Sequence, residues 1–238
     1  ALNYAPASHL PDGEPQFAAY ALGKDYHDVV KNKLRQLAEL LGLDNYRAFC
    51  DSAPVLERYW AVKAGLGWTG RNHQLIIPRA GSMFFLGELF LPVELDYDEP
   101  MTSRCGKCHA CVDACPTHAL RMGEGSEDDE EKGKTCFDAR LCLSYQTIEN
   151  RGEIPSELSE KMGDTIYGCD RCQAACPWNR FSQPNTTPEL QPSDELLNMK
   201  REDWLALTEE DYRRLFKGSA VKRAKYSGLM RNIHEALD

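Results

Sequence analysis

The residues best suited to chemistry in this 238-residue chain are its cysteines, and nine of the ten lie between Cys105 and Cys176. A reducing compartment keeps thiols free, so a cytoplasmic protein has little structural use for so many of them. A disulfide framework would be typical of a much shorter secreted chain. The distribution therefore predicts metal binding, and it divides the protein at about residue 100.

The first cysteine run, at residues 105–116, has the spacing C-x2-C-x2-C-x3-C-P. This is the bacterial ferredoxin pattern, in which three thiolates hold one 4Fe-4S cluster and the fourth reaches a second cluster. Residues 169–177 repeat the ending as C-x2-C-x3-C-P. The crossed arrangement assigns to cluster one Cys105, Cys108, Cys111 and Cys176.

Cluster two then takes Cys115, Cys169 and Cys172, and its fourth thiolate comes from Cys142 or Cys136. The alternative is a pair of structural zinc sites, because zinc ribbons also use C-x2-C pairs. Ribbons do not explain the longer run with its terminal proline, so two cubane clusters are preferred. Cys50, on a predicted strand, is interpreted as a small core residue.

The composition limits the class of protein that holds these motifs. With 28 Lys+Arg and 37 Asp+Glu the net charge is −9, and 42% hydrophobic residues suffice for a packed core. A mean hydropathy of −0.53 without a long apolar run predicts no membrane span. Residues 1–6 do not resemble a signal peptide, so a cytoplasmic protein is expected. The absence of an initial Met suggests an N-terminal truncation.

The first hundred residues have the pattern of an α/β region. Apolar spacing predicts a helix over residues 28–41 that ends at Gly42, a strand over 46–50 and a helix over 54–64. Residues 73–77 and 82–91 are predicted strands joined by a turn. Asp51 thus follows a strand, at the carboxyl end where open α/β sheets hold ligands.

The rest of the chain is dominated by loops and cysteine motifs. The acidic stretch at residues 124–132 is typical of a solvated loop and is given no function. Residues 182–192 have the composition of a linker, and the tail from residue 201 is predicted to be helical and anchored by aromatic residues.

Several blocks of sequence, taken together, resemble the epoxyqueuosine reductase family. A generic two-cluster ferredoxin has neither the GKDYH block nor the GCD-x-CQ block of this chain. The resemblance covers nearly the whole chain and is carried by residues 23–28, 51–58, 64–72, 105–116, 142–149 and 167–179.

The resemblance implies an enzyme of the last step of queuosine biosynthesis. Such an enzyme reduces epoxyqueuosine at the wobble position of a tRNA to queuosine, with electrons passing from two 4Fe-4S clusters to cobalamin. It implies a monomer with tRNA and an external low-potential electron donor as partners. It also selects Cys142 as the fourth ligand of cluster two, which leaves Cys136 as a free thiol.

The resemblance also assigns residues to the pocket. Asp51 matches the proton donor of the family, and to be protonated near pH 7 it must be desolvated under cofactor and substrate. The alternative for Asp51 is the N-cap of the helix at Pro54. Residues expected near cobalamin or substrate are Asp25, Tyr26, His27, Gly67, Trp68, Gly70 and Asn72. Asp25 has a helix-capping alternative too.

Binding of tRNA by an acidic protein requires segregated charge. Residues 213–231 contain seven basic residues and no acid, with Phe216 and Tyr226 between them. Phosphate contact is predicted there, at Lys222, Arg223 and Lys225, although a solvated basic helix face would have the same sequence.

The sequence therefore predicts an α+β protein with three parts. Residues 1–100 form an α/β domain of cobalamin-binding type, truncated at its start; residues 101–181 form a ferredoxin-like double 4Fe-4S module; residues 182–238 form a linker and a helical tail. One alternative function is a corrinoid reductive dehalogenase, disfavoured by the basic tail and the lack of an export signal. The other is a non-enzymatic two-cluster electron-transfer protein.

Overall fold

The structure is a computed structural model that describes residues 1–123 and 134–237. The acidic stretch predicted as a loop, residues 124–132, lies outside the described residues. The strands are β1 Leu2–Asn3, β2 Gln16–Phe17, β3 Arg47–Phe49, β4 Trp68–Thr69, β5 Leu75–Ile76, β6 Phe84–Phe85, β7 Glu88–Phe90, β8 Leu120–Met122, β9 Thr135–Phe137 and β10 Thr165–Tyr167.

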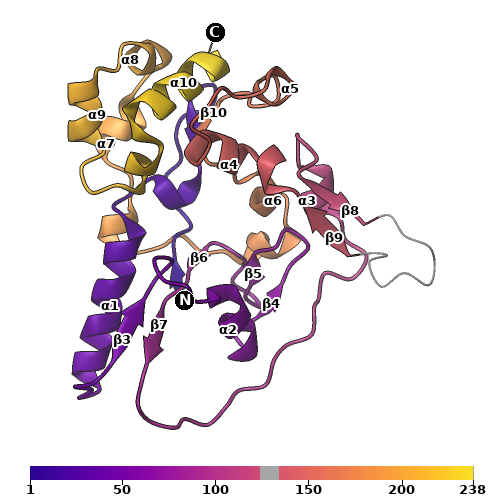
Figure 1. Ribbon diagram of the computed structural model, residues 1–238, viewed down its shortest axis with the longest axis vertical. Helices are drawn as coiled ribbons and strands as arrows, with labels where there is room; N and C mark the ends of the chain where they lie inside the picture. The colour runs from indigo at the N-terminus through magenta and orange to yellow at the C-terminus, as the bar shows by residue number, and fades with distance from the viewer. Residues whose placement is uncertain (124–133, 238) are drawn as a thin grey trace.

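Short helices alternate with these strands, and the two longest, α1 and α10, lie near the two ends of the chain (Figure 1). The α-helices are α1 Tyr26–Leu40, α2 Glu57–Lys63, α3 Ala110–Asp113, α4 Leu143–Ile148, α5 Ser156–Ser159, α6 Arg171–Ala174, α7 Asp194–Asn198, α8 Arg201–Leu205, α9 Glu209–Leu215 and α10 Lys225–Leu237. The 3-10 helices are η1 Ala19–Ala21, η2 Ala139–Leu141, η3 Pro177–Phe181, η4 Pro188–Leu190 and η5 Ala220–Ala224.

Helix α1 confirms the helix predicted over residues 28–41. The side chain of Asp25 accepts a hydrogen bond from the backbone of His27 and so caps the first turn. Val29 and Val30 are buried on its inner face, against the core that contains Cys50. The helix stops before Gly42, which has φ +65 and takes the left-handed conformation that glycine tolerates.

The strands form two-stranded pairs in the described residues, and only β2 and β10 run parallel. The expectation that Asp51 lies at the edge of an open α/β sheet is therefore wrong. The predicted strand over 82–91 is divided into β6, which pairs with β1, and β7, which pairs with β3. Strand β5 pairs with β4, and in the described residues the end of the first predicted strand forms an isolated bridge from Ile77 to Gly81 of the turn.

The parallel pair joins the start of the chain to its later half. Phe17 of β2 stacks on Tyr167 of β10, with ring centroids 5.7 Å apart, and also contacts Trp204. Gly168 follows β10 with φ +72, and a Cβ there would lie 2.4 Å from the Cβ of Ala18. Only glycine allows this close approach. The predicted domain boundaries remain a prediction, although packing crosses both of them.

The helical tail packs on the cysteine-rich region rather than lying free (Figure 1). Asn232 of α10 is fully buried and donates to the carbonyl oxygens of Thr147 and Ile166 at 2.7 and 2.9 Å. Helices α8, α9 and α10 thus confirm the prediction that the tail from residue 201 is helical. In the described residues no helix is long and apolar enough to cross a membrane.

Candidate active site

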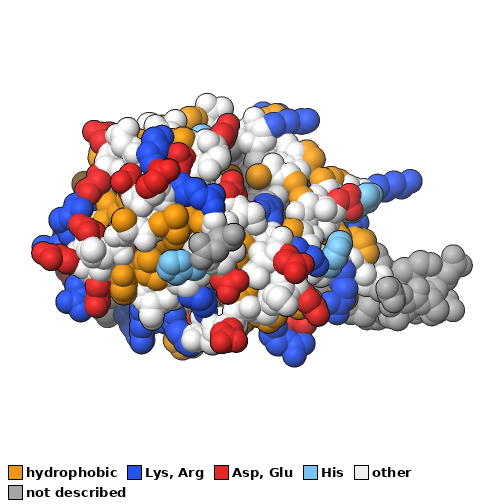
Figure 2. All heavy atoms as spheres, turned by 90° about the horizontal axis from the view of Figure 1, so that it is seen from above, with side chains coloured by type: hydrophobic (Ala, Val, Ile, Leu, Met, Phe, Trp, Pro, Cys, Tyr) orange, Lys and Arg blue, Asp and Glu red, His pale blue; other side chains and the backbone are white. Residues whose placement is uncertain are grey.

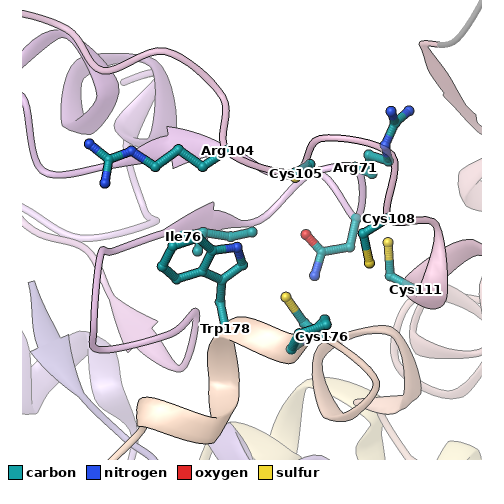
Figure 3. A pocket seen from close by; sticks show the side chains of 10 residues that line it. Arg71, Ile76, Arg104, Cys105, Cys108, Cys111, Cys176 and Trp178 are labelled. Atoms are coloured by element: carbon teal, nitrogen blue, oxygen red, sulfur yellow. The ribbon is translucent and has the colours of Figure 1, made fainter.

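The first set of four thiols lines a small pocket of about 150 Å³. Its members are Cys105, Cys108, Cys111 and Cys176. Figure 3 shows the sulfurs of Cys108, Cys111 and Cys176 turned toward one common space, while the guanidinium groups of Arg71 and Arg104 point away from it. Helix α3 and the start of η3 bring these residues together from opposite ends of the cysteine-rich region.

The second set of four thiols opens onto a much larger cleft of about 1450 Å³. Its members are Cys115, Cys142, Cys169 and Cys172. Cys142 directly precedes α4, and Cys172 lies in α6, which packs against α3. Cys136 lies on β9 and lines neither the pocket nor the cleft in the described part of the chain.

The surroundings of the second set of thiols favour the protonated, neutral form of the cysteines when no metal is bound. Burial, and then the neighbouring thiols of Cys169 and Cys142, raise the pKa of Cys172 to about 12. Burial likewise raises the pKa values of Cys142 and Cys169. Because thiolates are the ligands of iron–sulfur clusters, cluster insertion here would release protons.

A polar group that includes Tyr26, His27 and Asp51 lines the same cleft as the second thiol set. The phenol of Tyr26 donates a hydrogen bond to Asp51 Oδ2. The ring of His27 faces the same oxygen, with Nε2 3.7 Å away. The Asp51 side chain is 60% exposed, so its carboxyl faces the cleft rather than the core.

Stacked rings hold Tyr26 in place. Its ring is parallel to that of Phe85, with centroids 4.3 Å apart, and it also stacks on His27 at 4.1 Å. Burial, followed by the hydrogen bond to Asp51, raises the pKa of the Tyr26 phenol well above its ordinary value. Tyr26 therefore keeps its proton and remains a donor to Asp51.

Asp51 is not the helix cap that was its alternative role. Helix α2 begins at Glu57, three residues later than predicted, and its N-cap is Leu56. Asp51 itself has φ +50, which is uncommon for a residue other than glycine. Its backbone N–H donates to Glu57 Oε1. The loop is thus held at both its backbone and its side chain.

Asp25 has the capping role that was its alternative, together with a second contact. Its Oδ1 accepts from the backbone N–H of His27 at 3.0 Å and lies 2.6 Å from Nδ1 of the same residue. This contact orients the imidazole so that Nε2 faces Asp51. Asp25 therefore positions His27 as well as starting the helix.

Some residues of the glycine-rich segment at positions 64–72 pack against neighbouring segments, and others line the site. A Cβ at Gly67 would lie 2.0 Å from the carbonyl oxygen of Ile76, and one at Gly70 would lie 2.5 Å from the Ile76 side chain. Trp68 is buried against Trp178. These three predicted pocket residues pack against neighbouring segments, and cofactor contact by them stays a prediction.

Asn72 is the member of that segment at the site. It is buried, lines both the pocket and the cleft, and its side-chain amide donates to the carbonyl oxygen of Cys172 at 3.4 Å. Asn72 thus links the two thiol sets. Cys50 is fully buried, as expected for a core residue.

Most cations of the tail already have partners. Ion pairs join Arg213 to Glu209 and Arg223 to Glu149. Arg231 donates to the carbonyl oxygens of Gln146, Asn150 and Gly152. Figure 2 shows Lys and Arg side chains interspersed with Asp and Glu over this part of the surface.

The predicted phosphate-contact residues separate in the structure. Lys222 and Arg223 line the cleft, whereas Lys225 does not. Phe216, expected between the basic residues at the surface, is buried in the core, and the Tyr226 hydroxyl donates to the carbonyl oxygen of Leu207 at 2.9 Å. Neither ring is free to stack on a base.

Sequence reasoning missed two glutamates behind the Asp51 loop, Glu57 and Glu88. Glu57 accepts from the backbone of Asp51, and Glu88 lies opposite Phe49 in the β3–β7 pair. Glu57 lies in the block at residues 51–58 that carries the family resemblance but had no role assigned to it, and Glu88 lies in none of those blocks. Only the pairing of β3 with β7 brings Glu88 to the loop.

Two protein-family models match this chain, one over its N-terminal part and one over its cysteine-rich region. Residues 1–52 match the family described as "Epoxyqueuosine reductase QueG, DUF1730". Residues 104–179 match "4Fe-4S double cluster binding domain", which includes both cysteine runs. The double-cluster match supports two iron–sulfur clusters over the alternative of two zinc sites.

Solved structures of similar fold are also epoxyqueuosine reductases. One, a crystal structure with an epoxyqueuosine-modified tRNA-Tyr stem loop, superposes with a TM-score of 0.83 at 28% identity. Another, from Bacillus subtilis, has its catalytic aspartate loop swung out of the active site, with a TM-score of 0.83 at 27% identity. This chain is covered completely and spans 61% and 62% of those two chains.

Curated relatives are similar over almost the whole sequence. The epoxyqueuosine reductase of Cellulophaga algicola is 44% identical over 236 residues, which cover 98% of this chain and 74% of the relative. That of Escherichia coli is 43% identical over 246 residues, which cover 99% of this chain and 62% of the relative. By this similarity in sequence, together with the matching fold and cysteine motifs, the chain belongs to the epoxyqueuosine reductase family.

Proposed function

We propose that this chain reduces the epoxide of epoxyqueuosine in tRNA to the alkene of queuosine, with Asp51 as the proton donor. The observation that carries the proposal is a single cleft lined both by Asp51 and by the second thiol set. Removal of an epoxide oxygen as water takes two electrons and two protons, of which Asp51 would supply one and solvent the other. The cleft brings the source of the electrons and the Asp51 carboxyl to one place.

The thiol sets fit two 4Fe-4S clusters. Cys105, Cys108, Cys111 and Cys176 would hold the first, and Cys115, Cys142, Cys169 and Cys172 the second. Each set supplies the four thiolates that a cubane takes, and each lines one cavity. When bound, the clusters supply electrons one at a time.

The cleft also fits a large cofactor such as cobalamin. Ordinary small-molecule sites have volumes of roughly 300 to 1000 Å³, and the cleft of about 1450 Å³ exceeds that range. Such a cofactor supplies a low-valent metal centre when bound. Asp25, Tyr26, His27 and Asn72 line the space that it would occupy, and Asn72 borders the second thiol set.

The residues of the chain prepare Asp51 for proton donation. Tyr26 fixes one carboxyl oxygen, and the Glu57 contact fixes the backbone. The carboxyl is 60% exposed, so it loses its water only when cofactor and substrate fill the cleft. Desolvation then disfavours the charged form, which is how carboxyl acids become proton donors near neutral pH.

Phosphate contact is assigned to Lys222. This side chain is exposed, lines the cleft and has no ion-pair partner in the part of the chain that the structure describes. A tRNA substrate is supported by the solved relative that holds a modified tRNA stem loop. The salt-dependent attraction of phosphates would add to affinity without base specificity.

The decisive experiment combines metal analysis with single-turnover chemistry. The chain is reconstituted anaerobically with iron, sulfide and cobalamin, then reduced and mixed with an epoxyqueuosine-containing stem loop, and the nucleosides are analysed by mass spectrometry. We expect queuosine to form, about eight irons per chain and absorbance near 400 nm. Cluster absorbance without queuosine would favour the electron-transfer alternative. Dehalogenation of a halogenated phenol without queuosine would favour the dehalogenase.

A further inference from the structure

A pair of glutamates stands behind the Asp51 loop. Glu57 is the first residue of α2, and Glu88 is the first residue of β7. Glu88 lies directly opposite Phe49, two residues before Asp51. Glu57 accepts the backbone N–H of Asp51, and the charge of Glu57 raises the pKa of Glu88, so the two carboxyl groups lie near each other.

Two carboxylates close together repel each other, so one of them keeps its proton to a higher pH than usual. Burial, and then the charge of Glu57, raise the pKa of Glu88 to about 7. Burial also raises the pKa of Glu57. The pair therefore holds one proton below neutral pH.

The surroundings of the pair do not supply a strong cation to replace that proton. Asp51 raises the pKa values of both glutamates. Cys50 lies beside them as a buried thiol. Against these, His27 lowers the pKa of Glu57 and the amino group of Ala1 lowers that of Glu88, each as a minor contribution.

The loop needs such a contact. At φ +50 an aspartate is in a sparsely populated conformation, which persists only where neighbouring groups hold it. Tyr26 binds the side chain, and Glu57 binds the backbone. The Bacillus subtilis relative with its catalytic aspartate loop swung out shows that the loop of that protein has a second position.

We propose that Glu57 and Glu88 are positioning residues: Glu57 holds the backbone of the Asp51 loop so that the Asp51 carboxyl faces the cleft, and Glu88 on the neighbouring strand β7 supports Glu57. The inference deepens the proposed function and rests on it for the consequence, because a displaced loop matters only if Asp51 gives a proton. The contact itself stands on the geometry of α2 and β7. Glu88 anchors Glu57, and Glu57 anchors the loop.

The test compares Glu57→Ala with Glu57→Gln. The amide of Gln can still accept from the Asp51 N–H, whereas Ala removes that contact. We expect Glu57→Ala to lower kcat about tenfold with KM unchanged, the effect of one lost hydrogen bond, and Glu57→Gln to restore most of it. Glu39→Ala, an exposed helical glutamate, is the matched control.

The rate of hydrogen exchange at the Asp51 amide measures the contact between the Asp51 N–H and Glu57 without requiring turnover. In the cofactor-loaded protein we expect exchange about tenfold faster in Glu57→Ala than in the wild type, and near wild-type in Glu57→Gln and Glu39→Ala. Unchanged exchange in Glu57→Ala, or equal acceleration in Glu57→Gln, would overturn the proposal. If the wild type forms no queuosine, the proposed function fails, while the exchange result still decides whether the glutamates hold the loop.

Discussion

The two walls of the cleft differ in how far apart in the sequence their functional groups lie. The thiol wall takes three of its four cysteines from two short runs whose spacing already groups them, and the fourth, Cys142, lies between those runs. The opposite wall, which holds the proposed proton donor, brings together Tyr26, Asp51, Glu57 and Phe85 from separate helices, strands and a loop. Metal ligation needs residues of one type at fixed intervals, whereas proton donation needs one carboxyl in a particular surrounding.

The largest expected effect tests the thiol wall. Cys142→Ala should remove about half of roughly eight irons and abolish turnover, because a cubane loses one of its four thiolates. Cys136→Ala is the matched control, since Cys136 lies on β9 away from both cavities. Iron and sulfide analysis after anaerobic reconstitution measures both. Loss of iron from the Cys136 variant alone would show that the assignment of the fourth ligand is wrong.

A smaller effect is expected on the opposite wall. Asn tolerates a positive φ, can accept the Tyr26 hydroxyl and keeps the backbone contact with Glu57, but cannot donate an acidic proton. Asp51→Asn should therefore lower turnover by roughly 10² to 10⁴ while iron content, tRNA binding and thermal stability stay unchanged. Near wild-type queuosine formation by this variant would remove Asp51 from the mechanism and direct attention to Tyr26 or His27.

A smaller change is expected in the affinity for tRNA when Lys222, which lines the cleft, is replaced. Lys222→Glu places a negative charge in the cleft and should reduce tRNA affinity several-fold and lower the salt slope by about one. Lys225→Glu, with the same charge change outside the cleft lining, is the control. Fluorescence anisotropy with a stem loop over a range of salt concentrations measures the slopes. Equal losses in both variants would indicate non-specific attraction to the tail.

The smallest expected effect is on stability. The pKa of Glu88 is about 7 in the folded protein and about 4.3 when unfolded. The folded state thus binds the extra proton, so its contribution to stability is complete below about 4.3 and is lost as pH rises through about 7. Glu88→Gln should flatten this fall by about 1 kcal/mol, after allowance for solvent screening. Urea midpoints at several pH values measure it, and parallel curves for both proteins would contradict the assignment.

Much of the fold was predictable where the signal is local. The apolar spacing of α1 and the glycine that follows it confirm the first helix, and the cysteine spacing predicts residues that line shared cavities. The strands were predicted less well. Their pairing places β10 beside β2 and splits residues 82–91 between two partners, which depends on contacts across the whole chain.

The tail shows why charge alone was a poor guide. Seven basic residues without an acid in the same segment suggest a phosphate-binding face. In the structure acids from other segments neutralise several of them, as Glu149 does for Arg223, and Arg231 is used on backbone carbonyls. Of these seven basic residues, only Lys222 combines a place in the cleft with the lack of an ion-pair partner among the described residues.

The sequence by itself determined the cysteine motifs, the first helix and the family, because each depends on residue type at short spacing. The tertiary structure decided which carboxyl faces the cleft, which cations are already paired and which glutamates lie beside the Asp51 loop. Those properties depend on burial and on neighbours distant in sequence, as with Glu88 and Asp51. A carboxyl acquires its role from what surrounds it, and only the folded chain supplies those surroundings.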